Sequence, residues 1–298
     1  MRSLAQSSIA PVLGQRIPFR GPARALHRSF SKSPSRPDHS AKILATKFGD
    51  RFNVDLSSFL EWQLWVFGAY EEHLAELFRH LIRPGDRCID VGANIGVHTI
   101  RLAKLVGTQG EVIALEPDEE LAHRISVNLA LNYLTNVQII QAAASERGGD
   151  SVMLHRPDAQ DSNKGRASLL PHSYLTGSKA KVATTSIDDI AHGPVALIKI
   201  DVEGFEAPVV AGATRTIDTF LPSIIFEYDS DMLLNGLQSP FEWLEEKGYG
   251  LLGIRRTRHR LTGRGGLRLE RLRTLPTESA NILAVSRSMF SRVSSLIG

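Results

Sequence analysis

The sequence has a single cysteine and no long apolar run, and each of these absences excludes a class of protein. Because Cys88 stands alone among 298 residues, the chain has no internal disulfide and no site built from several cysteine ligands. Its position in an apolar segment predicts a buried and inert thiol. The longest apolar stretches fall well short of the roughly 18 residues that a membrane-spanning helix needs, so we expect no transmembrane segment.

Acidic residues are missing from the first 37 positions, although seven Arg and Lys residues lie there. An N-terminus rich in Arg and Ser and poor in acids is typical of organelle-targeting peptides, and a basic tail without a targeting role has the same composition. In both cases we expect residues 1–41 to lie outside a single domain formed by residues 42–298. We expect a cytoplasmic protein, with organelle targeting through the basic N-terminus as the alternative.

A second basic segment, RRTRHRLTGRGGLRLERLR at 255–273, raises the question of nucleic-acid binding. It lacks the aromatic side chains on which bases stack. The segment is more typical of a solvated hairpin with a glycine-rich tip, so a nucleic-acid partner is not expected. The sequence gives no indication of the oligomeric state.

Short apolar segments alternate with helical patterns from residue 87 onward. Strands are expected at 87–91, 111–115, 137–142, 195–200 and 223–227, and helices at about 96–106, 119–132, 204–217 and 239–247. A further helical pattern at 56–82 is interrupted at Gly68. This alternation predicts an α/β, Rossmann-like fold with a mostly parallel central sheet and helices on both of its faces. The runs GYGLLGI and NILAVSR predict an antiparallel strand pair near the C-terminus.

The first strand leads into the loop DVGANIG, residues 90–96. Gly92 allows the chain to leave the strand in a conformation that is unfavourable for other residues, and Gly96 lets the following helix come close. Glu116 lies at the tip of the next strand, 20 residues after Gly96. A carboxylate at that place accepts hydrogen bonds from ribose hydroxyls. The loop and Glu116 together predict an adenosine compound as the ligand.

Two classes of adenosine ligand remain. A dinucleotide needs the pattern G-x-G-x-x-G against its pyrophosphate, and here Asn94 separates the two glycines instead. Asp90 would repel a pyrophosphate but attract an amino group. S-adenosylmethionine offers a ribose for Glu116 and an amino acid group for the loop, and it is the predicted cofactor. A glycine turn without a ligand is the remaining alternative.

A second polar motif, LIKIDVEGFE, lies at 197–206, at the end of a later strand. Lys199 and Asp201 are two residues apart and therefore point to the same side, and Glu203 follows in the turn. Such groups are costly to bury unless they are paired or used. They form either an ion pair before an acidic helix start or a reaction site where a carboxylate accepts the proton of a hydroxyl. No ligand spacing predicts a metal site.

The ordered motifs DVGANIG, ALEPDEELAHRISVNLALN, NVQIIQAAAS, TTSIDDI, IKIDVEGFE and IIFEYD resemble those of the FkbM-type methyltransferases over roughly residues 67–229. The resemblance implies a class I S-adenosylmethionine-dependent enzyme that methylates hydroxyls of sugars or other small molecules. It implies that Asp90, Gly92, Asn94, Gly96 and Glu116 bind the cofactor, that Ala142 and Ala143 lie near its adenine, and that Lys199, Asp201 and Glu203 lie on the reaction side.

Other interpretations stay open at this point. They are a nicotinamide-dependent oxidoreductase, which the missing G-x-G-x-x-G disfavours, and a non-catalytic cofactor-binding protein, which the presence of both motifs disfavours. His98 either touches the ligand or faces solvent at the start of a helix, and Glu227 either faces the substrate pocket or does not. Trp62, Trp65 and Tyr70 either cover the cleft or pack in the core, and core packing is the favoured prediction.

Overall fold

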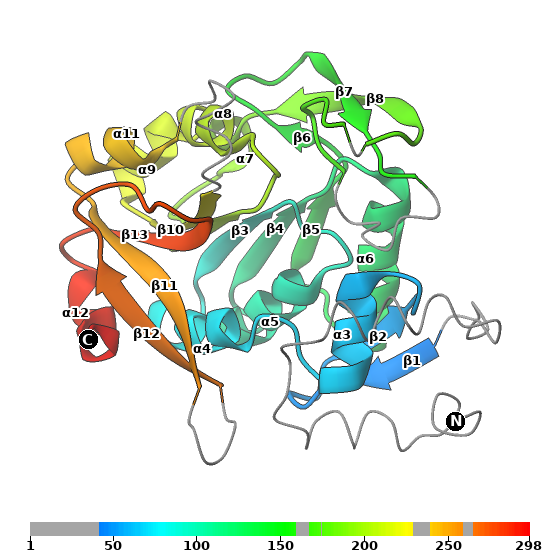
Figure 1. Cartoon of the computed structure of the whole chain (residues 1–298), viewed down its shortest axis with the longest axis horizontal. Coiled ribbons are helices and arrows are strands. Elements are labelled where there is room, and N and C mark those ends of the chain that lie inside the picture. Colours follow the sequence, from blue (N-terminus) through cyan, green and yellow to red (C-terminus); the bar gives the residue numbers. More distant parts are fainter. Residues whose placement is uncertain (1–41, 159–166, 174, 229–238, 259–264) are drawn as a thin grey trace.

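A computed structural model describes residues 42–158, 167–173, 175–228, 239–258 and 265–298 (Figure 1). The predictions for residues 1–41 and for the tip of the basic hairpin lie outside these ranges. The centre of the molecule is an eight-stranded sheet with the order β12-β11-β13-β10-β9-β3-β4-β5. Its strands are β3 (Arg87–Val91), β4 (Glu111–Leu115), β5 (Val137–Ile140), β9 (Leu197–Ile200), β10 (Ser223–Tyr228), β11 (Gly250–Arg258), β12 (Gly265–Arg271) and β13 (Ala280–Val285).

The five strands from β5 to β10 run parallel to one another, and β13 is antiparallel to both of its neighbours. The predicted α/β fold with a mostly parallel sheet is therefore confirmed, as is the antiparallel pair of GYGLLGI and NILAVSR. The described part of the basic segment forms the predicted hairpin, because β11 and β12 pair antiparallel at the edge of the sheet.

Two apolar clusters cover the two faces of the sheet, because successive strand side chains point to opposite sides. Cys88 and Leu197 belong to one cluster, and their chain neighbours Ile89 and Ile198 to the other. Helices α4 (Glu72–Leu81), α5 (Val97–Val106) and α12 (Phe290–Val293) cover the first face, and α7 (Ile187–Ile190), α8 (Glu206–Ala211), α9 (Thr214–Phe220) and α11 (Phe241–Glu246) the second (Figure 1). Burial raises the pKa of the Cys88 thiol, as expected for an inert cysteine.

A third apolar cluster lies beside the sheet, and the sequence predicted only its helices. It joins α3 (Phe59–Phe67) and α6 (Glu119–Leu131) to a small hairpin of β1 (Lys42–Ala45) and β2 (Arg51–Val54). Neither β1 nor β2 was predicted. None of the described helices is both long and apolar enough to span a membrane.

Three predicted element boundaries are informative. The break at Gly68 is confirmed, because this residue ends α3 in the left-handed conformation at φ 66°. The single helix expected at 204–217 is wrong, since the chain turns at Gly212, where a side chain would overlap the backbone of Ser145. The strand expected at 137–142 ends at Ile140. The chain then enters β6 (Ala143–Ala144) of a second sheet, which also contains β7 (Ser151–His155) and β8 (Lys179–Thr185).

The turn after β3 lies directly against the end of the neighbouring strand β9. Asp90 and Lys199 are partners in the strand register, and Gly92 follows with φ 75°. A Cβ atom at Gly92 would overlap the backbone carbonyl oxygen of Asp201. Only glycine therefore fits there. Because it has no side chain, the motifs DVGANIG and LIKIDVEGFE can lie against each other.

We expect Gly92→Ala to destabilise the protein more than Gly107→Ala. Both glycines have positive φ, so both substitutions carry a backbone strain of about 1–3 kcal/mol. A Cβ at Gly107 meets no atom within 4 Å, whereas one at Gly92 displaces backbone and adds about 1–3 kcal/mol. Urea denaturation measures the difference, and equal losses would show that the turn moves aside freely.

Candidate active site

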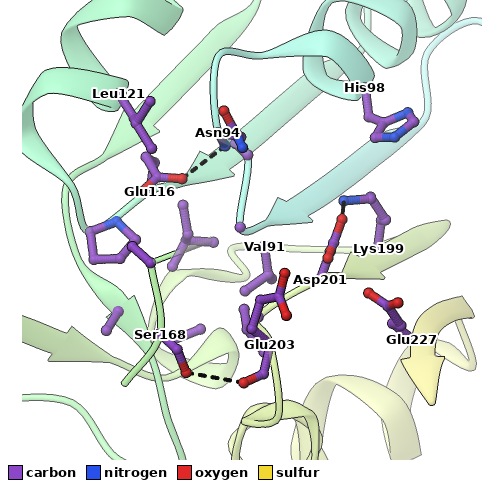
Figure 2. Close-up of a pocket in the computed structure, with 18 of the residues that line it drawn as sticks. Val91, Asn94, His98, Glu116, Leu121, Ser168, Lys199, Asp201, Glu203 and Glu227 are labelled. Atoms are coloured by element: carbon purple, nitrogen blue, oxygen red, sulfur yellow. Dashed lines mark hydrogen bonds and ion pairs between the residues drawn. The ribbon is translucent and has the colours of Figure 1, made fainter. Parts of the chain in front are cut away.

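A cavity of about 510 Å³ lies at the carboxyl ends of β3, β4, β9 and β10 (Figure 2). Its volume is within the range of small-molecule sites in proteins. Most of the residues that the sequence singled out lie on its wall, namely Gly92, Asn94, Glu116, Ala142, Ala143, Lys199, Asp201 and Glu203. Asp90 and Gly96 do not.

Glu116 is fastened to the turn after β3 by its own carboxyl group. Its Oε2 accepts a hydrogen bond from the backbone N–H of Asn94 at 2.8 Å, and its Oε1 accepts one from Asp118 at 3.0 Å. Asn94 holds this position with φ 53°. Burial raises the pKa of Glu116 to about 8, although the two backbone hydrogen bonds act in the opposite direction. The carboxyl is thus fixed in place at the cavity wall.

Asp90 and Gly96 do not line the cavity and contact neighbouring elements of the fold instead. The Asp90 side chain is fully buried, and its Oδ2 accepts a hydrogen bond from Thr99 Oγ1 at 2.6 Å. A direct ligand contact was predicted for Asp90, and the structure instead places its Oδ1 3.7 Å from Lys199 Nζ. Gly96 caps α5 at φ 87°, a conformation that favours glycine, and a Cβ there would make only ordinary contact with Ile125 on α6.

Lys199 lies between two carboxylates. Its Nζ is 3.0 Å from Asp201 Oδ2 as well as 3.7 Å from Asp90 Oδ1. Burial lowers the pKa of Lys199, but the charges of Asp201 and Asp90 outweigh burial and raise it, so the lysine stays protonated. Burial likewise raises the pKa of Asp201, and the Lys199 charge outweighs it and lowers the pKa. The Lys199–Asp201 ion pair, which the sequence analysis gave as the alternative to a reaction site, is present, and the Asp201 side chain is still 38% exposed.

Glu203 and Glu227 bring further carboxyl groups to the same part of the cavity. Glu203 has a positive φ of 47° and is followed by Gly204 at 100°, and its carbonyl accepts a hydrogen bond from Ser168 Oγ at 3.0 Å. A left-handed non-glycine residue is costly, and such residues cluster at functional sites. Burial, and then the negative charges of Asp201 and Glu203, raise the pKa of Glu227 to about 8.

Sequence reasoning missed Glu71. This residue precedes α4 with φ 41°, and its Oε2 lies 2.9 Å from Nε2 of His98 on α5. Burial raises the pKa of Glu71, but the His98 hydrogen bond outweighs it and the pKa is lowered. Both residues line the cavity, and His98 is buried rather than facing solvent. No motif surrounds Glu71, so only its contact with His98 identifies it.

The aromatic residues around α3 divide between core and cavity. Trp62 and Trp65 are buried in apolar clusters, as predicted, whereas Tyr70 lines the cavity. Burial raises the pKa of Tyr70 well above its ordinary value, and the neighbouring Glu71 adds to this effect. Phe59 and Leu60 show that α3 also covers the cavity with its first turn.

The cavity wall fits the polar groups of an S-adenosylmethionine molecule. A fixed carboxyl group at β4 suits ribose hydroxyls, and Gly92, Ala93 and Asn94 of the turn after β3 line the cavity beside it. Among the described residues, no group of three His, Cys, Asp or Glu side chains is placed to hold a metal ion. The fit therefore rests on hydrogen bonding, charge and shape.

We expect Glu116→Gln to remove part of the pH dependence of stability. The folded-state pKa of Glu116, about 8, exceeds the unfolded value of about 4.3. The wild type therefore loses stability as pH rises between these values, because only the unfolded state ionises readily. Glutamine does not ionise, so the stability of the variant relative to the wild type should grow from about pH 5 to 8. Chemical denaturation across this range measures the difference, and a constant difference would mean that the folded carboxyl is ionised throughout.

Comparisons with known proteins agree with the motifs. The family model described as "Methyltransferase FkbM domain" matches residues 90–251, which is more than half of the chain. A protein of Jannaschia sp. (strain CCS1), whose name marks it as a proposed methyltransferase, is 26% identical over 185 residues, covering 55% of this chain and 62% of that protein. This chain thus spans less than two thirds of that relative's length.

Two further similarities are more limited. Protein-L-isoaspartate O-methyltransferase 2 of Archaeoglobus fulgidus is 39% identical over 66 residues, 22% of this chain and 30% of that protein. The crystal structure of the methyltransferase FkbM from Methylobacillus flagellatus KT shares 16% identity, covers 76% of this chain and 53% of its own, and has a TM-score of 0.43. The extent of the family match decides the assignment: the chain belongs to the FkbM methyltransferase family, whose methyl donor is S-adenosylmethionine.

Proposed function

We propose that this protein transfers a methyl group from S-adenosylmethionine to a hydroxyl of a small molecule or sugar. One observation carries the proposal. The turn at Gly92 and Asn94, locked to Glu116, shares a cavity with the Lys199–Asp201 ion pair. The residues proposed to bind the donor (Gly92, Asn94 and Glu116) and those proposed to act on the acceptor (Lys199 and Asp201) thus line one cavity. The coverage of the family model supports methyl transfer, and the hydroxyl acceptor is inferred from the chemistry of Lys199 and Asp201.

The donor side consists of groups that recognise an adenosine and an amino acid. Glu116 would accept hydrogen bonds from the ribose hydroxyls, since its two backbone partners leave lone pairs on both oxygens. The backbone at Gly92 and Asn94 would hold the amino acid part, and Ala142 and Ala143 would leave room for the adenine. The bound cofactor supplies an already activated methyl group, so positioning is the main task of the protein.

The acceptor side holds groups that orient a hydroxyl and remove its proton. Asp201 is kept ionised by Lys199 and reaches the cavity, so its carboxylate can accept a hydrogen bond and then the proton. Lys199 stays protonated and holds that carboxylate in place. Glu203 and Glu227 lie on the same wall and would hold further polar groups of the acceptor.

The first test follows the methyl group from S-adenosylmethionine labelled in that group, in an extract of the source organism. We expect the label to appear on oxygen in a small-molecule fraction. Asp201→Asn should reduce the rate by about 10²- to 10⁴-fold, the usual contribution of a general base. The variant should bind S-adenosylhomocysteine with nearly the wild-type affinity. Its free energy of unfolding should also change little, because Lys199 retains Asp90 as a partner.

Two outcomes would contradict this assignment. Label found in protein or nucleic acid would change the acceptor class. Transfer by Asp201→Asn at the wild-type rate would show that Asp201 does not take the proton.

A further inference from the structure

We propose that Glu206 recognises the base of the cofactor, because its Oε2 accepts a hydrogen bond from the 6-amino group of adenine. The protein should therefore discriminate between adenine and hypoxanthine, in which an oxygen replaces this amino group. The inference rests on the proposed function, since it assigns a further contact to the ligand whose ribose Glu116 is proposed to hold.

Glu206 has one carboxyl oxygen with a partner and one without. The residue is only 1% exposed and lies on the wall of the cavity. Its Oε1 accepts a hydrogen bond from the backbone N–H of Gly204 at 3.3 Å, whereas its Oε2 has no hydrogen-bond partner among the described residues. A buried polar atom without a partner is costly. A hydrogen-bond donor on a ligand in the cavity would supply the missing partner.

The order of the strands places the base of the cofactor near the second sheet. Strands β3, β4 and β5 are neighbours in that order. A ligand with its amino acid part at Gly92 after β3 and its ribose at Glu116 after β4 therefore has its base near the end of β5. Ala142 and Ala143 follow β5 and line the cavity there. Their side chains offer no hydrogen-bond acceptor to an amino group.

Helix α8, which carries Glu206, is in contact with the second sheet at both of its ends. In the turn before the helix, the carbonyl oxygen of Glu203 accepts a hydrogen bond from Ser168 Oγ at 3.0 Å, and Ser168 forms a bridge to the last residue of β7. Directly after the helix, a Cβ at Gly212 would overlap the carbonyl oxygen of Ser145, which follows β6. Glu206 therefore borders the end of the cavity where the base would lie.

The hydrogen-bonding chemistry of Glu206 suits an amino group and disfavours an oxygen in its place. Burial raises the pKa of Glu206 to about 7, although hydrogen bonds from the backbone act in the opposite direction. A hydrogen bond donated to Oε2 by a ligand favours the ionised carboxylate. The 6-oxo group of hypoxanthine has lone pairs instead of a donor, so it would leave the ionised Oε2 without a partner.

The experiment is calorimetric titration of the full chain with S-adenosylhomocysteine and with S-inosylhomocysteine, which differ only in the base. It is done at about pH 8, where a carboxyl with a pKa of about 7 is mostly ionised. We expect the wild type to bind the adenosyl compound at least about tenfold more tightly, because the inosyl compound loses one hydrogen bond to a charged group.

Two substitutions of Glu206 change what this side chain offers to the base. In Glu206→Gln, the amide oxygen would keep the hydrogen bond from Gly204, so the NH₂ group takes the place of Oε2 and suits a 6-oxo group better than an amino group. This variant should lose the preference for the adenosyl compound or reverse it, and Glu206→Ala should bind both compounds about equally. Glu227→Gln alters another carboxyl on the cavity wall and should keep the wild-type preference. Far-ultraviolet circular dichroism confirms that each variant is folded.

The outcomes separate this inference from the proposed function. Equal affinities of the wild type for the two compounds, or tighter binding of the inosyl compound, overturn the role of Glu206 and leave the proposed function standing. A wild-type preference that persists in a folded Glu206 variant, or that is also lost in Glu227→Gln, shows that other groups read the base and likewise overturns the inference. Failure of both compounds to bind the wild type contradicts the proposed function itself.

Discussion

The close approach of Gly92 to the backbone of Asp201 determines the architecture of the site. A side chain at Gly92 would overlap the Asp201 carbonyl, so the turn after β3 and the end of β9 can meet only if that position is glycine. Glu116 reaches the same turn from β4 through the N–H of Asn94. The ends of the three neighbouring strands β3, β4 and β9 are therefore in contact. As a result, residues about 110 positions apart in the sequence line the same cavity.

The acidic residues near this contact fall into two groups, according to whether a lysine lies beside them. Asp90 and Asp201 lie beside Lys199, and the lysine lowers the pKa of Asp201. Glu116 and Glu227 have no lysine beside them among the described residues, and burial raises the pKa of each to about 8. Buried charges of this kind contribute little to stability, and strongly shifted pKa values concentrate at functional sites. The arrangement is accounted for by ligand binding better than by folding.

The sequence predicts the sheet well because strand and helix periodicities are local, and the two motifs stand out because glycine and paired polar residues interrupt apolar runs. The direct contact expected of Asp90 is different, since its residue type and position suit either a ligand or a neighbouring strand. The register places Asp90 beside Lys199, and register is a tertiary property. Glu71 was missed for the same reason: its partner His98 lies 27 residues away, with no pattern linking them. The split of α8 from α9 likewise depends on a distant backbone contact at Gly212.

The account requires that Glu116 holds the ribose of the cofactor, and calorimetry with S-adenosylhomocysteine and NADH tests this requirement most directly. We expect the wild type to bind S-adenosylhomocysteine and not NADH. Glu116→Ala should weaken that binding by about 1–3 kcal/mol, the range for two ordinary hydrogen bonds to the ribose hydroxyls. Binding of NADH without S-adenosylhomocysteine, or an unchanged dissociation constant for the folded Glu116→Ala variant, would contradict the account.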